Sequence, residues 1–480
     1  MRPKILLLPI LLALALHAEA ESTLKKNVLL LCIDDLRPEL KSFGVDYIHS
    51  PNIDRLAASG RAFHRHYVNA PTCGASRYSL LTGQYGSSNN QALFARAKQL
   101  EASDASVTPS LPEWFRKNGY TTVSVGKVSH HPGGWGGEDW YDNNILEMPG
   151  AWDRQLMPTG QWRHPRGAMH SLADGEIRMG RSFTENKMDA FQSADVDDTS
   201  YHDGLIAEAG IHQLKDLAQS DTPFFLAIGL IKPHLPFGSP AKYMEPYRDS
   251  ELPPIPYPEK PDWRTTWHKS GEFFGQYNHH EQDPRQNSDY ADQVRRHYAA
   301  CVTYADKLVG DILESLEASG KADETIVVLW GDHGWNLGEH AIWGKHNLFE
   351  EALRSPLIIS LPRMEQAGQK TDAIVETTDI FPTLCELNGL PVPDFVHGES
   401  LLPILEDASA SGHPAYSYYK NAKTIRTETH RFTLHEDGYA ELYDHTSPLK
   451  ETQNIAEQNP QLVKTYKQLL LQESSLHQTN

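Results

Sequence analysis

The chain has 480 residues, of which 39% are hydrophobic, and this is enough for one large domain or for a large domain with a smaller satellite. Its formal net charge is −19 at pH 7. Because nucleic-acid binding needs a basic face, a nucleic-acid partner is excluded, and any anionic substrate must be held by positive charge gathered locally in a site.

The first twenty residues have the pattern of a secretory signal peptide. Arg2 and Lys4 give a basic start, residues 5–16 form an apolar run, and Ala18-Glu19-Ala20 is a small-x-small cleavage signal. The apolar run is short for a bilayer and no later segment is long and apolar enough, so a cleaved signal is favoured over a retained anchor. We therefore expect cleavage after Ala20 and a periplasmic or secreted protein without a membrane anchor.

Apolar runs of the strand type alternate with helical patterns along the chain. The clearest strands are predicted at residues 27–33, 121–125, 224–231 and 326–330. The clearest helix is predicted at residues 289–319, where apolar side chains recur at three- and four-residue spacing. Continuous apolar strands of this kind are typical of a mostly parallel sheet covered on both faces, so we expect an α/β fold.

Polar side chains follow each of these four strands at its carboxyl end. They are Asp34 with Asp35, Gly126 with Lys127, Lys232-Pro233-His234, and Gly331-Asp332-His333. Ligands bind beyond the carboxyl ends of the strands in such sheets, so this pattern predicts one site at that edge.

Two long stretches have the composition of loops, and the tail has a pattern of its own. Residues 130–153 are rich in Gly and Trp, and residues 238–287 are rich in Pro, His and charge. Long loops are often functional, and exposed tryptophans suit stacking on sugar rings, with simple anchoring of the loop as the alternative. After a polar boundary at residues 406–413, the tail predicts a small antiparallel sheet with one helix, from strands at 416–419, 431–434 and 441–443 and a helix at 460–472.

The four cysteines are too few for a disulfide framework in an exported protein of this size. Cys32, Cys301 and Cys385 lie in apolar strand-like or helix-like runs and are expected to be buried small hydrophobes. Cys73 is surrounded by Gly, Pro, Thr and Ser instead, which indicates a different role.

Asp34 and Asp35 are adjacent acids just past an apolar strand. Two carboxylates so close repel each other unless a cation neutralises them, which makes calcium or magnesium a natural partner. The alternative is a polar exit from the strand with a helix N-cap.

The segment at residues 73–83, Cys-Gly-Ala-Ser-Arg-Tyr-Ser-Leu-Leu-Thr-Gly, resembles the signature of the sulfatase family, Cys-x-Pro-x-Arg followed by a short spacer and Thr-Gly. Ala75 stands where the usual signature has proline. The resemblance extends over nearly the whole mature chain, through Asp-Asp-Leu-Arg-Pro at 34–38, Pro-Asn-Ile-Asp-Arg-Leu at 51–56, Gly-Lys-Val at 126–128 and Gly-Asp-His-Gly-Trp at 331–335. The Asp-Asp-Leu-Arg-Pro and Asp-His-Gly-Trp runs are most similar to the iduronate-2-sulfatase branch.

The resemblance implies an alkaline-phosphatase-like α/β sandwich, with a catalytic domain over residues 21–405 and a C-terminal α+β subdomain over residues 413–480. It also implies that a formylglycine-generating maturation enzyme oxidises Cys73 to formylglycine, whose hydrated aldehyde supplies the nucleophilic hydroxyl. A serine that attacked a sulfate monoester would leave a stable sulfo-enzyme, whereas the second hydroxyl of a geminal diol can expel sulfate. The residues after Cys73 have a helical pattern, and a helix N-terminus favours an anion.

The same resemblance implies one bound Ca²⁺ that polarises the sulfate oxygens, held by Asp34, Asp35, the modified Cys73, Asp332 and His333. A His nitrogen is an unusual ligand for a hard cation, so the alternative for His333 is a hydrogen bond to sulfate.

The other catalytic residues are also assigned by resemblance. Arg77 would hold the diol, and Lys127 and Lys345 would bind sulfate oxygens. His130, with His131 as the alternative, would take the proton that releases sulfate, and His234 would protonate the leaving alcohol as general acid.

The function implied is exo-acting hydrolysis of sulfate monoesters on a sulfated oligosaccharide or polysaccharide. One alternative is a phosphoester or phosphonate hydrolase on the same scaffold, which would be expected to hold additional cationic or metal ligands. Another is a non-catalytic glycan-binding relative in which Cys73 stays unmodified.

Overall fold

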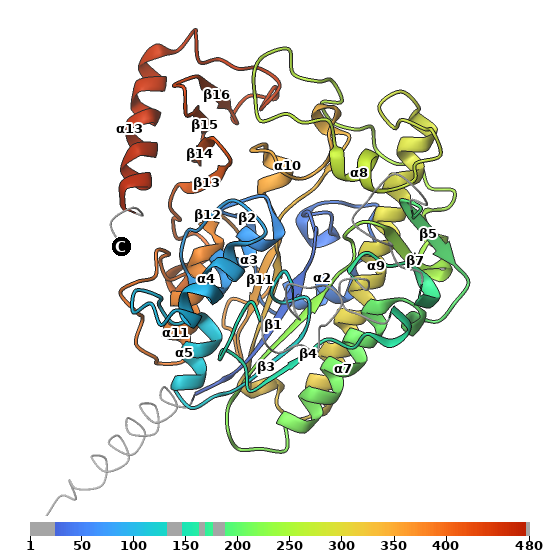
Figure 1. Cartoon of the computed structure of the whole chain (residues 1–480), viewed down its shortest axis with the longest axis vertical. Coiled ribbons are helices and arrows are strands. Elements are labelled where there is room, and N and C mark those ends of the chain that lie inside the picture. The colour runs from blue at the N-terminus through green and yellow to red at the C-terminus, as the bar shows by residue number, and fades with distance from the viewer. Residues whose placement is uncertain (1–24, 132–145, 163–168, 176–187, 477–480) are drawn as a thin grey trace, which may run out of the picture.

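The computed structural model describes residues 25–131, 146–162, 169–175 and 188–476 (Figure 1). The predicted signal peptide lies outside these residues, as do Trp135 and Trp140 of the first predicted loop.

An eight-stranded sheet lies at the centre of the molecule, in the order β12-β2-β11-β8-β1-β6-β3-β4. Its middle strands are parallel to one another: β8 (Thr325–Gly331), β1 (Asn27–Ile33), β6 (Phe224–Leu230) and β3 (Thr121–Gly126). The strand β11 (Leu357–Ser360) is antiparallel to both neighbours, β8 and β2 (Arg61–Tyr67), whereas the edge strands β12 (Lys370–Glu376) and β4 (Arg154–Leu156) pair in parallel. The sheet is therefore mixed but mostly parallel, which confirms the predicted α/β class.

The central strand β1 is buried on both faces, which explains its unbroken apolar sequence. Leu29, Leu31 and Ile33 join one apolar cluster, and the alternate side chains of Val28, Leu30 and Cys32 join another. The first face is covered by α2 (Pro51–Ala58), α7 (His202–Leu217) and α9 (Ser288–Ala318), and the second by α3 (Cys73–Thr82), α4 (Ala92–Glu101), α5 (Leu111–Lys117) and α11 (Ile380–Leu387) (Figure 1).

The long helix α9 matches the predicted helix to within one residue at each end. It begins after Asn287, whose side-chain oxygen accepts a hydrogen bond from the backbone N–H of Tyr290 at 3.1 Å. Its apolar stripe, which includes Tyr298, Cys301 and Val302, packs against the sheet.

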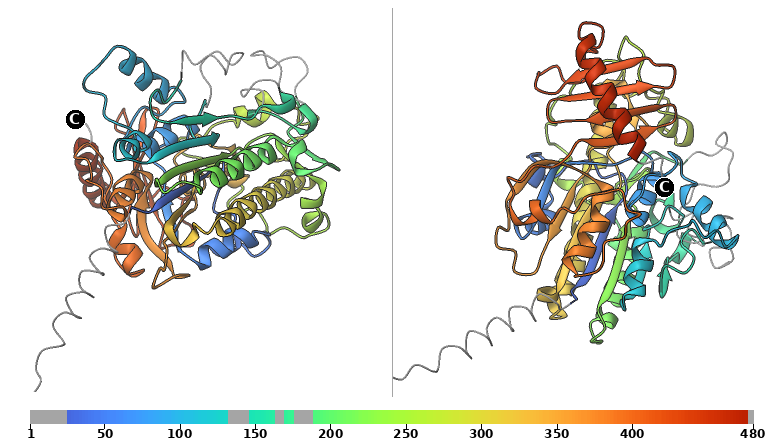
Figure 2. Two further views of the ribbon diagram at one scale, coloured as in Figure 1. Left: turned by 90° about the horizontal axis from the view of Figure 1, so that it is seen from below. Right: turned by 90° about the vertical axis from the view of Figure 1, so that its left-hand side faces the viewer.

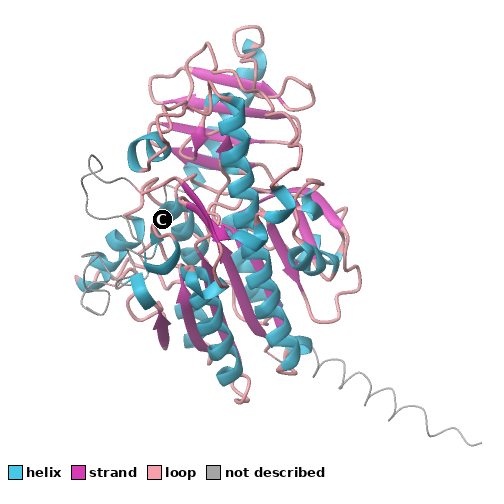
Figure 3. Cartoon of the chain, turned by 90° about the vertical axis from the view of Figure 1, so that its right-hand side faces the viewer, coloured by secondary structure: helices cyan, strands magenta, loops and turns pink. Residues whose placement is uncertain are grey.

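A second, smaller sheet lies at the C-terminal end of the chain, with a helix across it (Figures 2 and 3). It is antiparallel and consists of β13 (Ala415–Tyr419), β14 (Ala422–Arg426), β15 (His430–His435) and β16 (Ala440–Asp444), with α13 (Pro460–Leu476). This confirms the predicted C-terminal α+β subdomain, in which β14 was the one strand not predicted.

The stretch at residues 238–287, predicted as a loop, contains regular structure. The strand β7 (Phe237–Pro240) pairs in parallel with β5 (Phe191–Ala194), and α8 (Gly271–Gln276) forms further along. Both elements are too short to give a periodic pattern, so the loop prediction was wrong there. Further along the chain lie four more short elements: β9 (Asn336–Leu337), β10 (Trp343–Gly344), α10 (Glu350–Leu353) and α12 (Leu402–Glu406).

All four cysteines are unpaired and buried, as expected for Cys32, Cys301 and Cys385.

Within the described ranges, no helix combines the length and the apolar character needed to cross a bilayer.

Candidate active site

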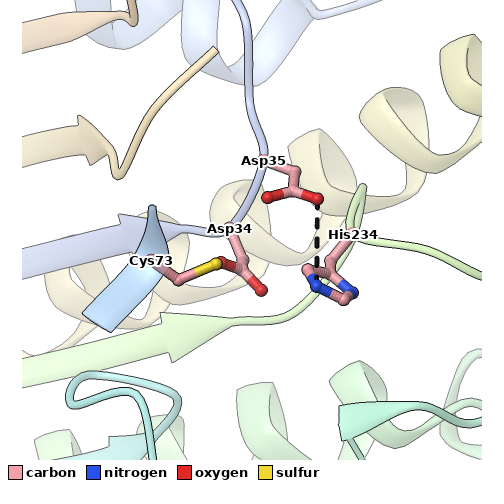
Figure 4. Close-up of side chains that lie close together, drawn as sticks. All are labelled: Asp34, Asp35, Cys73 and His234. Atoms are coloured by element: carbon pink, nitrogen blue, oxygen red, sulfur yellow. Dashed lines mark ion pairs between the residues drawn. The ribbon is translucent and has the colours of Figure 1, made fainter. Parts of the chain in front are cut away.

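Residues from separate strand ends meet at the carboxyl edge of the large sheet. Asp34 and Asp35 follow β1, Asp332 and His333 follow β8, and Cys73 is the first residue of α3. The candidate ligand atoms of Asp34, Cys73, Asp332 and His333 lie within 4.8 Å of one another, and so do those of Asp34, Asp35, Cys73 and His234 (Figure 4). The two groups share Asp34 and Cys73, and together they contain all five residues of the predicted metal site.

The loop after β1 holds Asp35 in an unusual backbone conformation. Its φ is +58°, a left-handed value that only a few per cent of non-glycine residues adopt, and such conformations cluster at functional sites. Two hydrogen bonds hold it: the Asp35 N–H donates to Asp332 Oδ1 at 2.9 Å, and the Tyr298 hydroxyl of α9 donates to the Asp35 carbonyl at 2.8 Å. The surrounding fold therefore fixes this acid.

Arg77 lies one turn into α3, fully buried, and links three strand ends. Its Nη2 lies 3.2 Å from Asp34 Oδ1 and 3.0 Å from Asp332 Oδ2, and its Nη1 donates to the carbonyl oxygens of Lys127 and Val128. In this arrangement Arg77 holds the acids in place and offsets their charge.

Two lysines complete the cationic lining. The Lys127 ammonium pairs with Asp34 Oδ2, and the Lys345 ammonium donates to Asp35 Oδ1 at 2.8 Å and lies 3.3 Å from the Cys73 sulfur. The positive charge needed for an anionic substrate in this acidic chain is thus gathered in one place.

The electrostatics of the three acids indicate that more positive charge belongs here. Burial favours the neutral form of all three, but at Asp34 the positive charges of Lys127 and Arg77 outweigh it and hold the pKa well below its ordinary value. Burial, followed by the repulsion of the other acids, raises the pKa of Asp35 well above that value and the pKa of Asp332 to about 7. A divalent cation would allow all three acids to ionise together.

The donor set fits such a cation. Carboxylate oxygens are the ligands that hard divalent cations prefer. His333 Nδ1 lies 2.9 Å from the carbonyl oxygen of Gly334, which can only accept, so the proton is on Nδ1 and the Nε2 lone pair faces the cluster, 3.2 Å from the Cys73 sulfur. Metal-bound histidines commonly have this arrangement.

His234 follows β6 and is oriented in the same way, since its Nδ1 donates to the carbonyl oxygen of Leu235 at 2.6 Å. Its Nε2 faces Asp35 Oδ2 at 3.9 Å (Figure 4). The same nitrogen lies 3.5 Å from Glu272 Oε1. The sequence did not reveal Glu272, because it lies on the six-residue helix α8 inside the predicted loop and belongs to no motif.

His130 and His131, the two alternatives for the residue that accepts a proton, lie in different environments. The His131 ring stacks on Phe94 at 5.4 Å, and its backbone N–H donates to Glu147. The His130 ring is 9% exposed and its Nδ1 has no hydrogen-bond partner within the described residues. Burial, then the charges of His131 and Lys127, hold the pKa of His130 well below its ordinary value, so its imidazole is neutral.

A cavity of about 580 Å³ adjoins the site and is lined by two segments of the catalytic region, within residues 264–272 and 343–346, and by the C-terminal sheet. Its lining includes Glu272 and Lys345 from the site, Trp267 and His268 from the segment before α8, and Tyr419 and Lys420 from the end of β13 and the turn that follows it. Of the predicted loop tryptophans, Trp152 packs against Phe225 at 6.2 Å and so anchors its loop.

Comparison with known families decides the class of protein. Residues 26–390 match the family model described as sulfatase. The chain belongs to the sulfatase family. It is therefore a sulfuric ester hydrolase, and the resemblance to this family that the sequence motifs indicated is confirmed. Residues 338–478 also match the model described as N-sulphoglucosamine sulphohydrolase, C-terminal.

Among curated relatives, the chain is similar to the iduronate 2-sulfatases of mouse and human. It is 30% identical to the Mus musculus protein over 76% of this chain and 69% of the relative, and 30% identical to the Homo sapiens protein over 86% and 82%. It is also 29% identical to a sulfatase of Formosa agariphila over 90% of this chain and 83% of that protein. These matches support the iduronate-2-sulfatase branch.

Solved structures confirm the alkaline-phosphatase-like sulfatase fold. One, a protein in complex with its substrate D-glucosamine-2-N,6-O-disulfate, has a TM-score of 0.72 and 20% identity over 95% of this chain and 99% of that chain. The phosphonate monoester hydrolase of Agrobacterium radiobacter has a TM-score of 0.74 and 20% identity over 94% and 96%. At these identities the likeness concerns the fold alone.

Proposed function

We propose that this sulfatase hydrolyses sulfate monoesters on a sulfated oligosaccharide or polysaccharide, as an exo-acting, iduronate-2-sulfatase-like enzyme of polysaccharide or glycosaminoglycan degradation. The observation that carries the proposal is the position of Cys73 at the start of α3, with its sulfur 3.2 Å from His333 and 3.3 Å from Lys345 amid three buried acids. The relatives support a saccharide substrate, since two are iduronate 2-sulfatases and a solved neighbour binds a disulfated glucosamine.

The nucleophile is formylglycine, made from Cys73 by a maturation enzyme. Once formed and hydrated, it supplies one hydroxyl to attack sulfur and a second to expel sulfate. The start of α3 suits this role because its backbone N–H groups and helix dipole favour a bound anion. Ala75, in place of the usual proline, is fully buried against the apolar cluster of the C-terminal subdomain.

Calcium is the proposed metal, held by Asp34, Asp35, Asp332, His333 and the modified residue 73. When bound, it supplies Lewis-acid polarisation of the sulfate oxygens. The raised pKa values of Asp35 and Asp332 support this assignment, because these acids lack the positive charge that would let them ionise.

The remaining groups bind sulfate and move protons. Lys127 and Lys345 neutralise the sulfate, and this also relieves the repulsion that keeps His234 neutral, because burial and these two lysines lower the pKa of His234. With its Nδ1 proton fixed on the carbonyl of Leu235, a protonated His234 donates from Nε2 to the leaving oxygen. His130, neutral and with a free Nδ1 within the described residues, accepts the proton that releases sulfate.

A phosphoester or phosphonate hydrolase is the second candidate, because phosphonate monoester hydrolases share the fold with TM-scores of 0.74. Phosphate carries more charge than sulfate, and the described cluster holds the ligands of a single metal with no extra cationic set. A non-catalytic glycan-binding relative would leave Cys73 unmodified.

Paired assays separate these three functions. Protein from the native host should contain formylglycine at position 73, detected by mass spectrometry as a peptide lighter than the cysteine form. It should hydrolyse an aryl sulfate faster than the matching aryl phosphate or phosphonate, and release sulfate from one member of a panel of defined sulfated oligosaccharides. Faster phosphate or phosphonate release would instead favour the second candidate, and an unmodified Cys73 with no turnover would favour the third.

We also propose that the protein is exported to the periplasm or beyond, with cleavage after Ala20, and that its catalytic domain spans residues 21–405 and its C-terminal subdomain residues 413–480. N-terminal sequencing of the protein recovered from its host should begin at Glu21. A first residue of Met1 would contradict the export proposal.

A further inference from the structure

Glu272 is a largely buried carboxylate that the proposed reaction does not use, although it lies against two residues of that reaction. Glu272 Oε1 is 3.5 Å from His234 Nε2, and Glu272 Oε2 is 3.7 Å from Lys345 Nζ. Its side chain is 13% exposed, and it forms part of the wall of the 580 Å³ cavity beside the catalytic centre. Glu272 thus separates the proposed general acid from the space that the rest of the substrate would occupy.

The Glu272 carboxylate has an acceptor position that the protein leaves open. Its Oε2 is buried and has no hydrogen-bond partner within the part of the chain that the structure describes. Lys345 does not supply one, because its ammonium lies 3.7 Å from this oxygen, which is beyond hydrogen-bond distance. A buried carboxylate oxygen without a donor is costly, so a donor is expected to come from the ligand.

The position of Glu272 indicates which ligand group this donor is. His234 Nε2 is the atom that would protonate the leaving oxygen, so that oxygen must lie close to Nε2 and therefore close to Glu272 Oε1. On a sugar ring, the hydroxyl on the carbon next to the sulfated one lies within hydrogen-bond reach of the leaving oxygen. That hydroxyl would therefore lie beside the Glu272 carboxylate. Because a carboxylate can only accept a hydrogen bond, the hydroxyl would be the donor.

We propose that Glu272 is a specificity-determining residue that binds a free hydroxyl on the carbon next to the sulfate ester, and that it disfavours substrates with a second anionic group at that carbon. The inference rests on the proposed sulfatase function of the same site. The reason for discrimination is charge: a hydroxyl donates to the carboxylate, whereas a neighbouring sulfate would face it with like charge in a partly buried place. The substrate class is therefore a sulfate ester with an unsubstituted neighbouring hydroxyl.

Three aryl sulfates test this without knowledge of the natural saccharide. Catechol monosulfate has a free hydroxyl next to the ester, 2-methoxyphenyl sulfate has that hydroxyl blocked, and catechol bis-sulfate has a second sulfate there. The readout is the ratio of kcat/KM between two esters on one preparation of the full-length mature enzyme. Incomplete conversion of Cys73 or partial misfolding cancels in such a ratio.

The wild-type enzyme should prefer catechol monosulfate to the methoxy ester by about tenfold or more, as expected for a hydrogen bond to a charged group. Glu272→Ala should reduce this preference to about twofold or less. Glu272→Gln keeps an acceptor but loses the charge, so it should retain part of the preference and raise the relative kcat/KM for the bis-sulfate by about fivefold or more. Glu251→Gln is the matched control, because Glu251 is an exposed residue of the same segment that lines a different cavity, and it should leave both ratios unchanged.

The outcomes for the inference and for the proposed function are distinct. A wild-type enzyme that hydrolyses none of the three esters would contradict the proposed function, and the inference with it. A wild-type enzyme that is active but shows no preference for the free hydroxyl, or one whose preference persists in Glu272→Ala, would overturn the inference alone. A purely structural role for Glu272 would lower all three rates together and leave the ratios where they were.

Discussion

The sulfur of Cys73 lies between the Lys345 ammonium and the His333 ring, so the consequences of removing it are specific. Cys73→Ala should abolish turnover, by at least about a thousandfold, because the variant has no nucleophile to generate. The fold should survive, since a small side chain replaces a small side chain in a site held by other contacts. Aryl sulfate hydrolysis and thermal unfolding measure the two effects. The control is Cys385→Ala, which removes a buried cysteine from the core between α11 and the sheet and should lose some stability but keep activity. Sulfate release by Cys73→Ala would overturn the mechanism.

Individual residues show which parts of the candidate site could be predicted from the sequence and which could not. Asp34, Asp35, Lys127, His234 and Asp332 could be grouped from sequence because each follows a strand of one parallel sheet. The role of Arg77 is more than was predicted: its guanidinium links Asp34 and Asp332 and holds two carbonyl oxygens of the segment after β3. These contacts join residues that are far apart in the sequence, so the spacing of motifs along the chain does not predict them.

At the scale of secondary-structure elements, α9 supports the loop that carries the two acids. The Tyr298 hydroxyl donates to the Asp35 carbonyl at 2.8 Å and accepts from the Arg37 N–H at 3.0 Å. Tyr298→Phe leaves both backbone groups without that partner and should lower the free energy of unfolding by about 1–3 kcal/mol, with weaker metal binding. Urea unfolding and calcium titration would measure these effects.

The same helix offers a control for this substitution. Tyr290 is also buried on α9, but its hydroxyl has no hydrogen-bond partner within the described ranges. Tyr290→Phe should therefore change the free energy of unfolding by less than about 0.5 kcal/mol. Equal losses in the two variants would mean that the Tyr298 hydrogen bonds do not support the acid loop.

The strand β1 could be predicted because its burial is complete and its side chains are apolar, whereas β2 was missed because polar residues are buried in it. All seven residues of β1 are buried and apolar except Asn27, so its run was clear. The sequence of β2, Arg-Ala-Phe-His-Arg-His-Tyr, is rich in polar side chains and gives no clear strand pattern, yet Arg61 and His66 are fully buried. Arg61 donates to backbone carbonyls of residues 366, 369, 404 and 405, and His66 contacts Ser355 and Thr377. These partners are distant in sequence and satisfy the polar groups only once the chain has folded.

At the scale of the whole molecule, the stability of the metal-free protein should depend on pH through its buried acids. Burial and neighbouring acids raise the pKa of Asp332 to about 7 and that of Asp35 well above its ordinary value. Above about pH 4 the unfolded chain releases these protons while the folded protein keeps them. Stability is therefore lost as the pH rises from about 4 through about 7, at up to about 1.4 kcal/mol per pH unit for each such group.

A bound divalent cation should remove this loss, because it favours the ionised acids. Excess Ca²⁺ should therefore raise the free energy of unfolding more at about pH 7 than at about pH 5.5, by about 2 kcal/mol for each acid that it ionises. Glu147, whose pKa burial raises to about 8, belongs to none of the described groups that could hold a metal, so it should affect the stability equally with and without calcium. The measurement is thermal or urea unfolding at both pH values in calcium and in a strong calcium chelator, with activity followed in parallel. Chelation should reduce turnover and added metal should restore it, whereas a calcium effect that is equal or larger at the lower pH would contradict metal binding by these acids.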